Sequence, residues 1–305
     1  MTSTVYLLLY GAMVTWLAPA PLSRLTRRGT NPRLGVAAWV TAMAGVLVAW
    51  TVAVGVVAVS LVRGGPNSSV VVLCLELLGV PEREAMLGAF AATGLLAVGV
   101  LVSAVVAVGV GRTVLGLRAH SAEHADAARI IGTPTDAEGV FVVAGERPAA
   151  YCVVGRPDTI VVTMAAVRAL DGPELDAVLA HEGAHIAGRH HHLLMVLRAL
   201  AASLAHLPLF TRGAAVVAEL LEMCADDTAA RRHGSRPLVA GMLALASPLP
   251  PSGGLAMAAT ATAARARRLL DPAGRSTRWC HRVATSATIA ATIGAPVVVN
   301  VLCHH

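Results

Sequence analysis

Two long stretches without a charged side chain constrain this sequence most strongly. Residues 34–62 and 85–111 contain no Asp, Glu, Lys or Arg. A helix needs about 20 apolar residues to cross a hydrocarbon core, so each stretch is long enough to span a membrane. Hydrophobic residues make up 56% of the 305 residues and the mean hydropathy is +0.68, which lies outside the range of soluble globular proteins. The chain is therefore predicted to be a membrane protein.

Two further apolar stretches, 3–22 and 283–303, are also long enough to cross. The first has no basic residues before it and no small-residue cleavage site, so we expect a retained span and not a removed signal peptide. The sequence thus predicts four transmembrane helices, over about 3–22, 34–62, 85–111 and 283–303.

Arginine placement predicts the orientation of these spans. The loop between the first two holds Arg24, Arg27, Arg28 and Arg33, whereas the loop 63–84 holds two arginines beside three glutamates. Short loops rich in Lys and Arg remain on the cytoplasmic side. We therefore expect a multi-pass protein of the cell membrane with both termini outside and the long segment after the third span inside.

The predicted organisation has three parts. Residues 1–111 form a three-helix membrane region, 112–280 form the only polar block of domain size, and 281–305 form the fourth transmembrane helix. The fold class is a mainly α membrane protein with a cytoplasmic α+β domain between helices three and four. The net charge of +6 comes from arginines with few aromatic residues among them, so we expect no direct nucleic-acid binding.

Short β-rich runs and one well-marked helix start organise the polar block. The runs, separated by Gly and Pro and predicting a small sheet, are 139–144, 150–155 and 159–163. Pro173 with acidic residues after it marks a helix start, and 118–131 and 214–232 also have helical character. The apolar run 193–210 could be a fifth span, a membrane-lying helix or a core helix. A fifth crossing conflicts with the arginines before the last span, so we expect this run to lie on or dip into the inner leaflet.

The chemistry is carried by the sequence His181-Glu182-Gly183-Ala184-His185. Residues i and i+4 of a helix lie on one face, where two imidazoles can reach one zinc ion at about 2.0–2.1 Å. The intervening Glu182 then serves as the general base that takes a proton from water and passes it to the leaving amine. His181 and His185 are accordingly the first two predicted metal ligands.

A third ligand is expected in the helical segment 214–232. Glu222 supplies a carboxylate, and Asp226 lies one turn later on the same face, where it can accept the outer N–H of His181 and fix the orientation of that ring. Glu219 is a competing ligand, although it lacks an acidic residue at i+4. Three protein ligands with an open position are typical of a catalytic zinc site, and four of a structural one.

His181-Glu182-x-x-His185 followed by Glu222-x-x-Ala225-Asp226 resembles the gluzincin pattern of integral-membrane peptidases, the HtpX-like and BlaR/MecR-like families. The resemblance implies one Zn²⁺ per chain, a gluzincin-type domain facing the cytoplasm, the lipid bilayer as surroundings and a protein or peptide substrate. Three spans, a zinc domain and a last span are closest to the BlaR/MecR antirepressor arrangement. In that group the protease inactivates a cytoplasmic DNA-binding repressor, and sometimes cleaves itself, after an extracellular signal.

The sequence departs from the β-lactam sensors of that group in one respect. They carry a penicillin-binding domain after the last span, whereas this chain ends at His305 and contains no lysine for a Ser-x-x-Lys nucleophile. We therefore do not expect direct acylation by a β-lactam. Regulatory cleavage is the favoured function. A quality-control protease for membrane proteins and a catalytically inactive zinc-binding scaffold for signalling are the alternatives.

Several other residues have weaker interpretations. One of His233 and Arg231 is a candidate for stabilising the oxyanion, against a simple role as helix C-terminal charge. The strand near 159–163 could bind an extended substrate by edge addition or be an ordinary sheet strand. We expect His190, His191 and His192 to form a solvated or interfacial basic cluster. We also expect Arg265, Arg267 and Arg268 to contact the inner leaflet.

Overall fold

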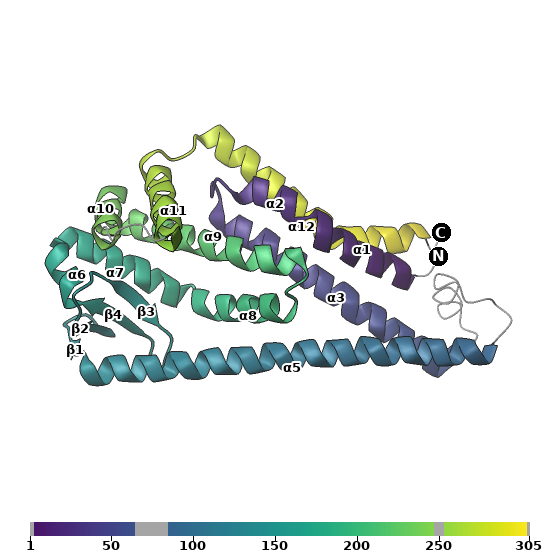
Figure 1. Ribbon diagram of the computed structural model, residues 1–305. Coiled ribbons are helices and arrows are strands. Elements are labelled where there is room, and N and C mark those ends of the chain that lie inside the picture. Colours follow the sequence, from purple (N-terminus) through teal and green to yellow (C-terminus); the bar gives the residue numbers. More distant parts are fainter. Residues whose placement is uncertain (1–2, 65–84, 247–252, 304–305) are drawn as a thin grey trace.

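The small sheet lies at one end of the molecule, and the candidate membrane-spanning helices extend toward the other end (Figure 1). The computed structural model describes residues 3–64, 85–246 and 253–303. The loop 63–84, on which part of the orientation argument depends, lies almost wholly outside these residues.

Two helices within the described residues are long and apolar enough to cross a membrane. They lie in α3 (Pro32–Gly64) and α5 (Ala85–Ile131), with candidate spans Pro32–Val59 and Thr93–Ile131. These correspond to the second and third expected spans.

The first expected span, 3–22, is a bent pair of helices. α1 (Ser3–Leu17) and α2 (Pro19–Thr26) meet at 48°, and counting the pair as one span gives three candidate spans. A proline at N1 of a helix is compatible with its geometry, but its ring disrupts the turn before it, so Pro19 accounts for the break. The two pieces pack against α3, and Figure 1 shows them beside it.

The fourth expected span, 283–303, lies within α12 (Arg275–Cys303), which contains Pro296. α12 packs along α3 and α1, and the Tyr10 hydroxyl donates a hydrogen bond to the Thr292 carbonyl at 2.7 Å. In the part of the chain that the structure describes, α12 is not among the candidate spans. The crossing by α12 therefore stays a prediction.

The helix α5 is one continuous rod of 47 residues, which at 1.5 Å per residue is about 70 Å long. The sequence predicted a span ending at 111 and a separate polar helix over 118–131. The six residues between them contain no proline, so nothing interrupts the backbone hydrogen bonds. Figure 1 shows α5 running from the membrane helices to the sheet.

The sheet has the order β1-β2-β4-β3 and is mixed. Its strands are β1 (Thr133–Pro134), β2 (Val140–Val143), β3 (Ala150–Val153) and β4 (Thr159–Thr163). The three strands expected from the sequence are confirmed, and β1 adds a short fourth. β4 pairs in parallel with β2 and antiparallel with β3, and all five of its residues are buried. β3 is therefore an edge strand, and its outer edge is not paired with another strand among the described residues.

Six helices complete the domain. They are α6 (Met164–Ala169), α7 (Gly172–Ala187), α8 (His190–Ser203), α9 (Pro208–His233), α10 (Ser235–Leu245) and α11 (Gly253–Leu270). α7 begins with a full capping box, in which Asp171 accepts from the Glu174 backbone N–H and Glu174 accepts from the Asp171 N–H. Both N-terminal backbone donors are thereby satisfied, so the helix that carries the H-E-x-x-H sequence starts where the acidic residues after Pro173 indicated.

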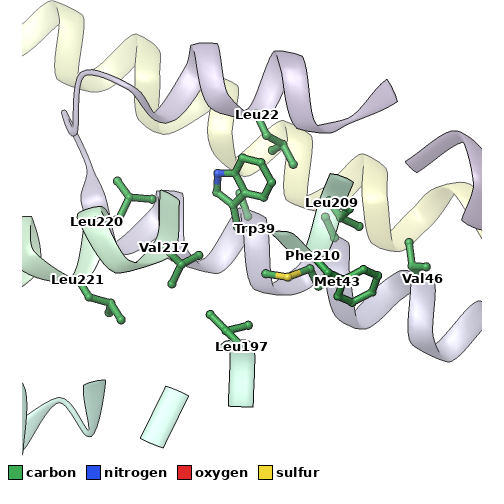
Figure 2. Close-up of a cluster of buried hydrophobic side chains, with 12 residues drawn as sticks. Leu22, Trp39, Met43, Val46, Leu197, Leu209, Phe210, Val217, Leu220 and Leu221 are labelled. Atoms are coloured by element: carbon green, nitrogen blue, oxygen red, sulfur yellow. The ribbon is translucent and has the colours of Figure 1, made fainter. Parts of the chain in front are cut away.

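The run 193–210 is a helical hairpin and not one helix. α8 ends at Ser203, and α9 begins at Pro208 after a short turn. Phe210 at the start of α9 is fully buried against Trp39 and Met43 of α3 (Figure 2). Trp39 lies about 10 Å along α3 from its first residue, so the hairpin packs beside a candidate span. This position supports the expectation that the run reaches the membrane, which stays a prediction.

Candidate metal centre

The predicted ligands come from α7 and α9, which pack directly against each other. His181 and His185 are buried and lie one turn apart on α7, with ring centroids 4.9 Å apart. Glu222 faces them from α9. His181, His185 and Glu222 each offer a ligand atom within 4.8 Å of the other two.

The ligand atoms have the spacing of a tetrahedral zinc site. His181 Nε2 lies 3.2 Å from His185 Nε2, and each nitrogen lies 3.5 Å from a carboxylate oxygen of Glu222. Four ligands at 2.0–2.1 Å from zinc are about 3.4 Å from one another in a tetrahedron. The residues therefore fit Zn²⁺ without rearrangement, and they supply three ligands, which leaves one position open.

The pKa values of these side chains reflect the crowding of charge. Burial alone would lower the pKa of His181, but the carboxylates of Asp226 and Glu222 outweigh burial and raise it to about 9. Burial would raise the pKa of Glu222, yet its contact with His181 and the charge of Arg265 lower it to about 2. Burial lowers the pKa of His185 to about 4. Glu222 is thus ionised and His185 neutral, the forms that bind metal, whereas His181 would lose a proton on binding Zn²⁺.

Asp226 orients His181 from behind. Its side chain is 0% exposed, and its Oδ1 lies 3.1 Å from His181 Nδ1. The two atoms lie within ion-pair distance without the alignment of a hydrogen bond, and His181 Nδ1 has no other partner among the described residues. A carboxylate in this place fixes the tautomer in which Nε2 faces the metal. The geometry agrees with the outer position expected for Asp226.

Arg265 of α11 holds both carboxylates of α9. Its guanidinium binds Asp226 through two nitrogens, at 2.8 and 2.6 Å, and places a third nitrogen 3.0 Å from Glu222. Burial would raise the pKa of Asp226, but this pairing lowers it to about 2. One turn later, Arg268 pairs with Asp227 at 2.8 Å.

The expectation that these arginines contact the inner leaflet is wrong for Arg265 and Arg268. Their side chains are only 17% and 16% exposed and face α9, whereas Arg267 between them is exposed. The sequence feature that corresponds to these ion pairs is the i, i+3 spacing of Arg265 and Arg268, which places both side chains on the face of α11 that packs against the acidic residues of α9. It could not be interpreted without knowing that α11 packs on α9, because 39 residues separate Arg265 from Asp226.

Glu182 lies in the same cavity as the ligands. This cavity, of about 330 Å³, is also lined by Leu117 of α5, Cys152 of β3 and Met195 of α8. The Cys152 backbone N–H donates to Glu182 Oε2 at 3.0 Å. Burial raises the pKa of Glu182, while the charge of His181 opposes that rise. The side chain is thus held at the metal side of the cavity with a pKa above that of an exposed carboxyl, as a general base requires.

The strand beside the cavity is β3, whereas the sequence interpretation had considered the strand near 159–163 for substrate binding. Residues 159–163 form β4, which is paired on both sides, so β4 has no free edge for a substrate. Cys152, whose N–H meets Glu182, belongs to the edge strand β3. Of the two interpretations of 159–163, an ordinary sheet strand is correct, and edge addition of a substrate to this strand is wrong.

The three consecutive histidines of α8 are not equally solvated. His190 is buried, and its Nδ1 lies 3.1 Å from Nδ1 of the ligand His185. The expectation of a solvated cluster is therefore wrong for His190, which lies directly behind a metal ligand. His191 is partly buried beside the Cys152 thiol, at 3.8 Å. The distinction depends on the turn at Gly188 and the left-handed Arg189, after which α8 begins with His190 facing His185.

The structure does not bring the remaining candidates to the ligands. Arg231 is exposed and donates to Thr228 at 3.0 Å; it lies nine residues after Glu222, or about 13 Å along the helix. His233 is the exposed last residue of α9. Glu219 is exposed and is not part of the ligand group. The cation that contacts the ligands is Arg265, so the oxyanion role of Arg231 or His233 stays a prediction.

Comparison with known proteins agrees with this geometry. Residues 118–248 match the family described as Peptidase family M48. The matched segment contains the sheet, all three ligands, Glu182 and Asp226, whereas Arg265 lies outside it. No curated protein and no solved structure matches the chain.

Proposed function

We propose that this chain, an M48 zinc metalloendopeptidase, cleaves a protein substrate at the cytoplasmic face of the cell membrane with Glu182 as its general base. One observation carries the proposal: the cavity that contains Glu182 also contains His181, His185 and Glu222 in tetrahedral spacing. Because three protein ligands leave a position open, this geometry favours a catalyst over a structural zinc scaffold.

His181, His185 and Glu222 would hold Zn²⁺, which would supply Lewis acidity to polarise a carbonyl and to lower the pKa of water to about 7. The protein supplies the proton transfers. Glu182 accepts the proton of the attacking water and later donates it to the leaving amine. The Cys152 N–H donates to one oxygen of Glu182 at 3.0 Å and so fixes the orientation of the carboxylate in the cavity.

The surroundings of Glu182 support binding of an extended peptide. β3 is an edge strand next to the cavity, and main-chain pairing to such an edge positions a peptide independently of its side chains. The opposite wall carries Leu117, Leu194 and Met195, which offer apolar contacts to a substrate side chain. We therefore infer an endopeptidase whose substrate lies between β3 and the wall formed by α5 and α8.

For the biological role we propose regulatory cleavage of a cytoplasmic DNA-binding repressor, of the chain itself, or of both. The resemblance to antirepressor peptidases supports this role. Quality control of membrane proteins is the second candidate, and the position of the cavity supports it. The cavity is bounded by α5, which contains a candidate span, and by the hairpin that packs on α3, so a segment leaving the bilayer could enter it.

The test compares Glu182→Gln with wild type in one detergent, measuring zinc content and cleavage of casein and of the chain itself. We expect about one zinc per chain for both proteins and a loss of cleavage of about 10²–10⁴-fold for the variant, as for removal of a general base. Glu219→Gln is the matched control, because Glu219 is an exposed glutamate on α9, and it should cleave like wild type. Equal cleavage by wild type and Glu182→Gln would contradict the assignment.

A further inference from the structure

We propose that a basic cavity between the first turns of α3 and α12 binds the headgroup of an anionic phospholipid. The cavity has a volume of about 1060 Å³ and lies apart from the ligand cavity. Five arginines from three elements line it, and we call them the arginine cluster. They are Arg33, Arg231, Arg275, Arg278 and Arg282.

The charge in this cavity is not balanced by the protein. The only acidic residue in its lining is Asp227, which pairs with Arg268 at 2.8 Å. All five side chains of the cluster are exposed. Among the residues that the structure describes, none of the five has a carboxylate within ion-pair distance. Like charges gathered around one cavity repel one another unless an anion lies between them, so the cluster favours an anionic ligand.

Arginine favours phosphate among the possible anions. Its planar guanidinium offers donors in a fork that matches two phosphate oxygens. Hydroxyl groups of Thr30 and Ser276 line the same cavity and add donors of the kind that bind phosphate and glycerol oxygens. This chemistry is common to a soluble phosphate and to a lipid headgroup.

The position of the cavity selects the lipid. Arg33 and Leu34 belong to the first turn of the candidate span Pro32–Val59, so the cavity lies where that helix leaves the bilayer. Trp279, on the facing wall from α12, is 67% exposed, and exposed tryptophans are enriched at the membrane interface. Asn31 donates to the Arg278 carbonyl at 3.0 Å, which joins the two walls. Basic pockets between such helices bind anionic headgroups, and the apolar surface of Leu34 and Trp279 would contact the upper acyl chains.

The experiment measures lipid binding to the purified full chain by native mass spectrometry, titrating phosphatidylglycerol or phosphatidylcholine into one detergent. We expect wild type to bind phosphatidylglycerol saturably and about tenfold more tightly than phosphatidylcholine. The variant Arg278→Gln/Arg282→Gln should lose about tenfold or more of that affinity, because each arginine near a membrane surface contributes severalfold to anionic lipid binding.

The matched control is Arg24→Gln/Arg27→Gln, which removes the same charge from two exposed arginines that do not line the cavity. It should bind phosphatidylglycerol like wild type. An equal loss in both double variants would mean that only overall charge matters and would overturn the site. Equal binding of the two lipids would overturn it too. Displacement of phosphatidylglycerol by inorganic phosphate at a similar concentration would assign the cavity to soluble phosphate and overturn the lipid assignment.

Discussion

At the scale of single side chains, Arg265 connects two carboxylates of the metal centre, those of Asp226 and Glu222. Its two bonds to Asp226 and its contact with Glu222 fix both carboxylates relative to the histidines. Asp226 is 0% exposed, and a buried carboxylate without a partner is costly. Arg265 contacts the ligand Glu222 and also Asp226, which lies against the ligand His181. We therefore regard Arg265 as a positioning residue and not as a catalytic one.

We expect Arg265→Gln to weaken zinc binding by about 10- to 100-fold, the usual effect of losing a group that orients metal ligands. The measurement is a competition between the purified protein and a chelator of known zinc affinity, which does not depend on proteolysis. Arg267→Gln is the control, because Arg267 lies on the same helix and is exposed. Equal zinc affinities for the two variants would show that the carboxylates keep their positions without Arg265.

The zinc ligands could be predicted from the sequence, but their surroundings could not. His181 and His185 are positioned by one helical turn, which is local geometry, and Glu222 with Asp226 repeats that spacing. The role of Arg265 depends on how α11 packs on α9, and that of His190 depends on the turn between α7 and α8. Tertiary contacts of this kind leave no periodic signal in the chain, so these residues were first interpreted as surface charges.

At the scale of elements, the contact of α9 with α3 joins the helix that carries Glu222 to a candidate span. Trp39 and Phe210 are nearly fully buried in it (Figure 2). Gly213 lies at the crossing, where an added Cβ would lie 3.1 Å from the Trp39 ring and 3.1 Å from the Met43 sulfur. The absence of a side chain at Gly213 therefore allows α9, the helix that carries Glu222, to pack closely on a candidate span.

Replacing Gly213 with leucine should separate α9 from α3. Overpacking a well-filled core typically costs about 1–3 kcal/mol, so the apparent melting temperature of the detergent-solubilised protein should fall by several degrees. Gly111→Leu is the control, because nothing lies within 4 Å of a Cβ at Gly111 on α5. A melting temperature equal to that of Gly111→Leu would mean that the α3–α9 contact adjusts without cost.

Elements with a local signal were predicted well. The three longer strands and the start of α7 follow from alternating β-rich runs, from proline and from acidic first-turn residues. The continuity of α5, the break between α8 and α9, and the order of the sheet were not predicted. The order of the sheet depends on which strand receives β-pairing from both sides, which the periodicity of a single segment does not contain. The continuity of α5 and the break before α9 did have local signals, the lack of proline over 112–117 and Pro208.

At the scale of the whole molecule, α5 links the membrane to the sheet without a flexible joint. It contacts α3 near one end and β2, β3 and β4 near the other. The side of the membrane on which α5 ends therefore decides where the peptidase domain lies. Arginine placement predicts that the domain lies inside, because a reversed orientation would require the four arginines between the first two expected spans to be carried across the bilayer.

Two native cysteines can test this orientation. Cys74 belongs to the loop 63–84, predicted outside, and Cys280 is exposed on α12 before the last expected span, predicted inside. In variants that keep only one of the two, a membrane-impermeant maleimide should label Cys74 in intact cells but Cys280 only after permeabilisation. Detergent-solubilised samples, in which both should react, control for reactivity. Labelling of Cys280 alone in intact cells would place the metal centre outside, and a cytoplasmic repressor could then not be its substrate.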